Sequence, residues 1–307
     1  MSGPALRAPI LWVSGLPFVR RMAQEGGLAR RVALRFVAGE TLDDGIHVAR
    51  RLNARGIGGM LDHLGENVAS PEQASAAADT YVLALKRIQD EGLPDTNISI
   101  KLTQLGLDVS PDLCLENAAR VLEAAGSTLV MIDMEASAYT ERTLGSYRAL
   151  RERHPNVGVC IQAYLYRSED DARALAREGA TVRVCKGAYL EPPTVAFPRR
   201  SEVDRNFGRI AATLLSAGCR VHIATHDPRL IAAARRFVRR RGIPRDQFEF
   251  QMLFGIRRDL QDGLGADGYH VRTYIPYGDQ WYPYLTRRLA ERPANVWFFL
   301  ANLLRRR

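Results

Sequence analysis

Cysteine and long apolar runs are scarce in this 307-residue sequence. Its four cysteines form no CxxC pair and no cluster with histidine, which excludes a disulfide scaffold and a structural zinc site. Unpaired cysteines are typical of a reducing compartment, so we expect a cytoplasmic protein without a metal. No apolar run approaches the ~18 residues that are needed to cross a bilayer. The composition, 46% hydrophobic and 25% charged, is that of a folded protein.

Lysine is also rare. The 43 basic residues include only three lysines, Lys86, Lys101 and Lys186, and the net charge is +9. Arginine clusters lie at residues 30–31, 235–241 and 305–307. Such charge is typical of solvated helix faces, but it also suits anionic lipid, nucleic acid or anionic ligands. Because no zinc-finger spacing, RNA-binding strand or helix-turn-helix signature occurs, we expect no nucleic-acid partner.

Eight short runs rich in β-branched or apolar residues alternate with helical stretches. The expected strands span residues 57–64, 97–103, 129–135, 158–164, 181–186, 220–226, 248–253 and 269–275. The clearest helices are expected over residues 71–90, 111–125, 168–178, 203–216 and 228–240. Eight βα units in about 240 residues predict a (β/α)8 TIM-type barrel. An open doubly wound sheet is the alternative, but no G-x-G-x-x-G follows the first strand.

The predicted barrel accounts for most of the chain. We expect a single domain over residues 1–307, with an N-terminal helical arm over 1–55 and the barrel with a final helix over 56–307. Residues 1–24 contain no acid, but their apolar stretch is short and broken by Pro17. A cleaved signal peptide is therefore not predicted.

Side chains alternate along a strand, so parity sorts the two faces of each predicted strand. One face is aliphatic and is expected to meet the helices. The other face carries polar residues in successive strands: Lys101, Asp133, Gln162, Arg183, His222, Gln251, and Arg272 with Tyr274. Burying so many polar groups without partners is costly, and a polar ligand in the barrel mouth would satisfy them.

Alternatively, some of these polar residues could form ion pairs or hydrogen bonds with one another and not bind a ligand. The candidate pairs are Lys101 with Asp133, and Arg183 with Glu249 or Asp133. The imidazoles of His222 and His226 could likewise be satisfied within the core. A purely structural origin for the whole polar face is harder to accept, because it recurs in nearly every strand.

Sequence blocks at these strands carry a family resemblance. The blocks are RFVAGET, MLDHLGE, SIKLTQLG, IDMEAS, VCIQAYLYR, RVCKGAYLE, ATHD, FEFQMLFGIR, RTYIPYG and YPYLTRRLAERPAN. Over about residues 35–300 the chain resembles proline dehydrogenases of the monofunctional bacterial type, and the matching domain of bifunctional proline-utilisation enzymes. The resemblance implies a distorted (β/α)8 barrel. One departure is the Arg292–Pro293 pair, where many members carry Asn-Gly.

The resemblance also implies a function. Members bind FAD non-covalently, oxidise L-proline to Δ1-pyrroline-5-carboxylate and pass the electrons to a membrane quinone, which is the first step of proline catabolism to glutamate. We therefore expect a separate pyrroline-5-carboxylate dehydrogenase downstream and peripheral association with the inner face of the cell membrane. The basic charge favours such an association.

Site residues are implied motif by motif. The residues that match flavin contacts are Met134, Gln162, Arg183, Lys186, Gly187, Ala188, Thr225, His226 and Gln251, with Arg183 beside the flavin N5. Those that match the substrate site are Lys101, Arg287 and Arg288 for the proline carboxylate, and Tyr189 at its border. Asp133 and Tyr274, with Arg183, match catalytic positions. Glu66 is expected to pair with Arg287 when the mouth closes.

Three other functions fit parts of the sequence. A class I aldolase-like barrel would use Lys101 or Lys186 as a Schiff-base nucleophile. A metal hydrolase would use His222, His226 and Asp227, although His-x-x-x-His on a strand spreads the two rings too far. A basic binding protein would need no catalytic residue. Flavin absorbance in the purified protein distinguishes the resemblance from all three.

Overall fold

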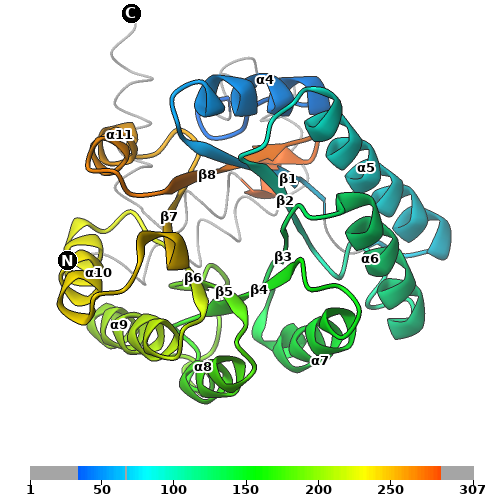
Figure 1. The fold of residues 1–307 in the computed structure, drawn as a ribbon. Coiled ribbons are helices and arrows are strands. Elements are labelled where there is room, and N and C mark those ends of the chain that lie inside the picture. Colours follow the sequence, from blue (N-terminus) through cyan, green and yellow to red (C-terminus); the bar gives the residue numbers. More distant parts are fainter. Residues whose placement is uncertain (1–33, 66–67, 285–307) are drawn as a thin grey trace, which may run out of the picture.

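The computed structural model describes residues 34–65 and 68–284, in which eight parallel strands close into a barrel in chain order (Figure 1). The strands are β1 (Gly58–His63), β2 (Thr96–Ile100), β3 (Val130–Ile132), β4 (Val157–Gln162), β5 (Thr181–Cys185), β6 (Arg220–Ala224), β7 (Phe248–Leu253) and β8 (Val271–Tyr277). Pairing of β8 with β1, from Gly58 opposite Arg272 to His63 opposite Tyr277, closes the barrel. The predicted (β/α)8 TIM-type fold is confirmed.

Helices ring the outside of the barrel (Figure 1). They are α4 (Leu42–Asn53), α5 (Pro71–Asp90), α6 (Pro111–Ala125), α7 (Thr140–Arg151), α8 (Ser168–Arg177), α9 (Arg200–Ser216), α10 (Pro228–Arg241) and α11 (Arg258–Ala266), with short 3-10 turns η1 (Ser137–Tyr139) and η2 (Arg245–Gln247). Within the described residues, none of these helices has the length and apolar character needed to cross a membrane.

Local capping sets the start of three helices. Ser70 precedes Pro71, and its hydroxyl accepts a hydrogen bond from the Gln73 N–H at 3.3 Å. Ser110 caps α6 in the same way, and Asp227 caps α10. A serine or aspartate satisfies a free N–H, and the following proline has none to satisfy. The predicted bounds of α5 and α6, residues 71–90 and 111–125, are confirmed at both ends.

The predicted bounds of later helices are slightly wrong. The start of α9 was expected at residue 203, but the helix begins at Arg200. There the Glu202 carboxylate accepts a hydrogen bond from the backbone N–H of Arg199 at 3.3 Å, which stabilises an earlier first turn. Helix α10 ends at Arg241, one residue later than predicted. The next residue, Gly242, takes a left-handed conformation with φ of 62° and stops the helix.

Most of the predicted strands extend too far toward their C-terminal ends, although β7 ends at Leu253 as predicted and β8 runs to Tyr277, two residues past the prediction. The strands β2, β3 and β6 end at Ile100, Ile132 and Ala224, because the chain there turns toward the next helix. The last bond between β2 and β3 joins the Asp133 N–H to the Ile100 carbonyl at 2.9 Å. Lys101 and Asp133 therefore lie just past their strands, at the mouth, where (β/α)8 enzymes place their active sites.

The aliphatic strand face packs outward, as predicted. Completely buried residues on this face come from seven strands and include Ile98, Val130, Val159, Val182, Val221, Phe250 and Val271. They share one apolar core with helix residues such as Leu85 and Ile210. Because this core occupies the space between sheet and helices, the polar face is left to line the barrel interior.

Candidate active site

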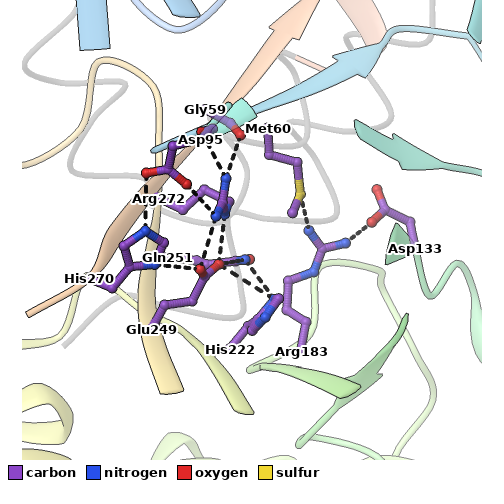
Figure 2. Close-up of polar contacts among 10 residues, drawn as sticks. All are labelled: Gly59, Met60, Asp95, Asp133, Arg183, His222, Glu249, Gln251, His270 and Arg272. Atoms are coloured by element: carbon purple, nitrogen blue, oxygen red, sulfur yellow. Dashed lines mark hydrogen bonds and ion pairs between the residues drawn. The ribbon is translucent and has the colours of Figure 1, made fainter. Parts of the chain in front are cut away.

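Side chains from β5 and β8 meet at the carboxylate of Asp133, which lies just past β3 at the mouth. Figure 2 shows the contacts of Arg183 with Asp133 and Met60. Arg183 Nη2 donates a hydrogen bond to Asp133 Oδ1, and the Tyr274 hydroxyl donates to Asp133 Oδ2 at 2.6 Å. The Arg183 guanidinium lies 5.4 Å from the centroid of the Tyr274 ring, and its Nη1 lies 3.0 Å from Met60 Sδ. The structure thus brings together the three residues that were matched to catalytic positions.

Burial determines what these groups can do. Arg183 is 5% exposed, and the opposite charge of Asp133 offsets much of the cost of burying it. Burial also raises the pKa of Tyr274 well above its ordinary value, so the phenol keeps its proton and acts as a donor. Of the alternatives for Arg183, the pair with Asp133 is the one found. Asp133 accepts hydrogen bonds from Arg183 and Tyr274, and so orients both side chains. Because both of its oxygens are engaged, it is poorly placed to act as a free base.

A more deeply buried ion pair joins Lys101 to Asp62 near the ends of β2 and β1. The side chains are 7% and 1% exposed. The alternative in which Lys101 pairs with Asp133 is therefore wrong. Asp62 was not among the predicted site residues, although the MLDHLGE block contains it and strand alternation puts it on the same face as Met60.

The residues matched to flavin contacts follow one another around the mouth. They lie in or just after β3 to β7. Gln162 ties two strand ends together, since its Nε2 donates to the Glu135 carbonyl at 2.7 Å and its Oε1 accepts from the Ala188 N–H at 3.2 Å. Gly187 has φ of +118°, and a Cβ there would overlap the Tyr164 ring, so only glycine fits.

Acids surround Lys186, which directly follows β5. Its Nζ lies 2.5 Å from Asp204 Oδ1 and 3.2 Å from Asp227 Oδ2. The hydroxyl of Thr225 accepts a hydrogen bond from the Asp227 N–H at 3.2 Å, which fixes the turn after β6. Lys186 is therefore placed as one member of a charged cluster on the side of the mouth formed by β5 and β6.

The remaining matched residues differ in their surroundings. Met134 is 6% exposed and packs in the main core. His226 Nε2 accepts a hydrogen bond from the Leu253 N–H at 2.9 Å, and Tyr189 is half-buried in the loop after β5. Outside the described residues lie Glu66, Arg287, Arg288 and the Arg292–Pro293 pair.

Nearer the base of the barrel, a charged network surrounds Glu249 (Figure 2). Arg272 donates to Glu249 Oε1 through Nε at 2.9 Å and to Oε2 through Nη2 at 3.2 Å. His270 bridges Glu249 Oε2 at 2.8 Å and Asp95 Oδ2 at 3.0 Å. The alternative pair of Arg183 with Glu249 is therefore wrong. Asp95 precedes β2, outside every predicted strand, and alternation could not have found it.

This network makes stability depend on pH through His270. Hydrogen bonds to Asp95 and Glu249 raise the pKa of His270 to about 9. Its contribution to the free energy of unfolding is therefore complete below its ordinary pKa of 6.5 and is lost as the pH rises through about 9. We expect urea unfolding between pH 6 and ~10 to show a steeper fall for the wild type than for His270→Gln. Parallel curves would contradict this role.

Comparison with known proteins decides the family. A family model described as proline dehydrogenase matches residues 46–300. The chain belongs to the proline dehydrogenase family. The interpretation of the sequence blocks is thereby confirmed.

Relatives in the family match nearly the whole chain. Proline dehydrogenase of Deinococcus radiodurans is 40% identical over 306 residues, which is 97% of this chain and 98% of the relative. Proline dehydrogenase 2 of Bacillus subtilis is 38% identical over 298 residues, or 96% and 98% of the two chains. Among solved structures, proline utilization A of Bdellovibrio bacteriovorus inactivated by N-propargylglycine has a TM-score of 0.80 at 24% identity. It supports the fold; the match covers 92% of this chain and 36% of that one.

The geometry gives no support to the rival chemistries. A Schiff base needs a neutral amine, whereas Lys101 is paired with Asp62 and Lys186 with two acids. No group of three or more His, Cys, Asp or Glu in residues 34–65 and 68–284 could hold a metal ion. The rings of His222 and His226 bond to Gln251 and to a backbone N–H, respectively.

Proposed function

We propose that this protein oxidises L-proline to Δ1-pyrroline-5-carboxylate on a non-covalently bound FAD and passes the electrons to a membrane quinone. The observation that carries the proposal is the cluster of Asp133, Arg183 and Tyr274 at the mouth of the barrel, in a chain of the proline dehydrogenase family. In this cluster Arg183 is buried, whereas Asp133 and Tyr274 are partly buried. Active sites of (β/α)8 enzymes lie at this end of the barrel. The reaction would be the first step of proline catabolism to glutamate.

The residues present fit a flavin. Oxidation of proline removes a hydride from C5, and no side chain accepts a hydride, so a cofactor is needed. The mouth offers both donors and acceptors, from Arg183, Gln162, Lys186 and Gln251. His222 is completely buried, and its Nε2 has no hydrogen-bond partner within the described residues. When bound, FAD supplies the two-electron acceptor.

Charged side chains would orient the substrate. Lys101 presents a point charge for the proline carboxylate, and the adjacent Arg287 and Arg288, outside the described residues, would bind it as planar forks. Arg183, held by Asp133, would place positive charge beside the flavin, where negative charge develops. The amine must be neutral for hydride loss, and bulk solvent can take its proton.

The purified protein should carry FAD and lose its yellow colour when L-proline is added under anaerobic conditions. NAD should not serve as the electron acceptor, because no dinucleotide fingerprint follows a strand. Activity should therefore need a quinone analogue. The measurement is the visible flavin spectrum during titration with L-proline, with D-proline as the control. Colourless protein that FAD cannot reconstitute, or equal turnover with NAD alone, would overturn the proposal.

We also propose that this protein is a single cytoplasmic domain that binds anionic lipid reversibly, and that a separate pyrroline-5-carboxylate dehydrogenase consumes its product. Exposed arginines end α10 at Arg239–Arg241, on the base side of the barrel. Lipid contact through these arginines alone would turn the mouth, where the flavin would bind, away from the membrane and its quinone. Contact must then also use the basic clusters at 30–31 and 305–307. We expect co-sedimentation with phosphatidylglycerol vesicles at low salt and release at high salt. Failure to sediment at low salt would contradict this.

A further inference from the structure

The amide of Gln251 is held by two acceptors on its base side (Figure 2). Its Nε2 lies 2.6 Å from Glu249 Oε1 and 2.9 Å from His222 Nδ1. A carboxylate oxygen can only accept a hydrogen bond, so the amide atom beside it must be the nitrogen. Both amide hydrogens are therefore used, and the flip of the Gln251 side chain is determined by chemistry.

Glu249 is itself fixed and ionised. Burial alone would raise its pKa, but the charge of Arg272 and hydrogen bonds from His270 and Arg272 hold the pKa well below its ordinary value. Arg272 and His270 occupy both carboxylate oxygens from the base side. The acceptor that faces Gln251 is thus held by two donors and ionised at neutral pH.

The second acceptor is a neutral imidazole. Burial lowers the pKa of His222 to about 4, so the ring carries one proton at neutral pH. Because Nδ1 accepts from Gln251, that proton lies on Nε2. Both partners of the Gln251 amide group therefore act as acceptors, and rotating the amide would place its oxygen against a carboxylate.

We propose that Glu249, assisted by His222, is a positioning residue that fixes the Gln251 amide so that its carbonyl oxygen is the group offered to the cofactor. Gln251 stands one inward-facing residue nearer the mouth than Glu249. Among the described residues its Oε1 accepts no hydrogen bond. This site selects a ligand with an N–H donor, as the pyrimidine ring of a flavin has. The inference rests on the proposed function.

The test compares release of flavin from holoenzyme variants. Gln251→Leu removes the oxygen and should speed flavin release roughly tenfold, which is the effect of one lost hydrogen bond. Glu249→Gln should have a similar effect and should shift the visible flavin spectrum, because the amide is no longer held in one orientation. The double variant should release flavin about as fast as Gln251→Leu alone, since Glu249 acts through Gln251.

Two matched variants separate positioning from general loss of stability. Asp95→Asn removes an acid from the same network without touching Gln251, and should lower the melting temperature while leaving flavin release and spectrum unchanged. If Glu249→Gln does not fold, His222→Asn and His222→Leu replace it. Asparagine keeps an acceptor for the Gln251 amide and leucine does not, so flavin should be released more slowly from the asparagine variant than from the leucine variant.

The outcomes are distinguishable. A wild-type protein that binds no flavin overturns the proposed function itself. If flavin binds, then multiplicative effects of Glu249→Gln and Gln251→Leu overturn the positioning role. So does Asp95→Asn speeding release as much as Glu249→Gln, or His222→Asn as much as His222→Leu. Equal release from the double variant and Gln251→Leu, with normal release from Asp95→Asn, supports it.

Discussion

Replacing Arg183 by alanine should both destabilise the fold and nearly abolish reduction of the flavin by proline. The change leaves the partly buried carboxylate of Asp133 without its cation. Breaking a fully buried pair costs about 3–5 kcal/mol of the free energy of unfolding, so we expect a loss at the lower end of that range here. It also removes the positive charge that would stabilise the reduced cofactor. Loss of one such preorganised group slows a reaction by about 10²–10³-fold. Urea unfolding and anaerobic stopped-flow reduction measure the two effects.

A matched series separates these effects. Arg183→Lys keeps a positive charge but loses the planar fork, so stability should partly recover while reduction stays slow. Adding Asp133→Asn to Arg183→Ala removes the uncompensated carboxylate and should restore much of the stability. Its amide oxygen can still accept from Tyr274. Wild-type stability together with a wild-type rate of reduction in Arg183→Ala would show that neither role is correct.

Local signals in the sequence predict the helices well. The start of α5 at Pro71 depends only on Ser70, Pro71 and the next turn, so the sequence contains all that determines it. Strand ends depend on neighbours. Asp133 looks like strand by alternation, yet it lies past Ile132 because the partner strand makes its last bond there. Patterns along one strand cannot show where pairing stops.

The candidate site is predictable in its composition but not in its pairing. Alternation places Lys101 and Arg183 on the inward face of their strands, and the structure buries both. Which acid each one meets depends on how the strands are shifted around the barrel. Asp62 lies opposite Ser99 in that register, two residues before Lys101, and this relation cannot be read from either strand alone. Family motifs likewise do not include Asp95, whose place in the network comes from the loop before β2.

The Lys101–Asp62 pair gives the second large effect. Lys101→Met should leave Asp62, which is 1% exposed, as an unpaired buried charge and cost about 3–5 kcal/mol of the free energy of unfolding. If Lys101 also binds the proline carboxylate, the same change should weaken proline binding by about tenfold to a hundredfold, which is the loss of one charge-assisted contact. Urea unfolding and proline titration of the flavin spectrum measure the two consequences.

The double variant Asp62→Asn/Lys101→Met separates fold from function at this pair. Removing both charges leaves no buried ion without a partner, so stability should return close to that of the wild type. Proline affinity should stay as low as in Lys101→Met, because the cation that meets the carboxylate is still absent. Asp62→Asn alone should lose stability but keep the cation. If the double variant regained proline affinity along with stability, Lys101 would be a structural partner of Asp62 only, and the carboxylate would have to be held by other groups.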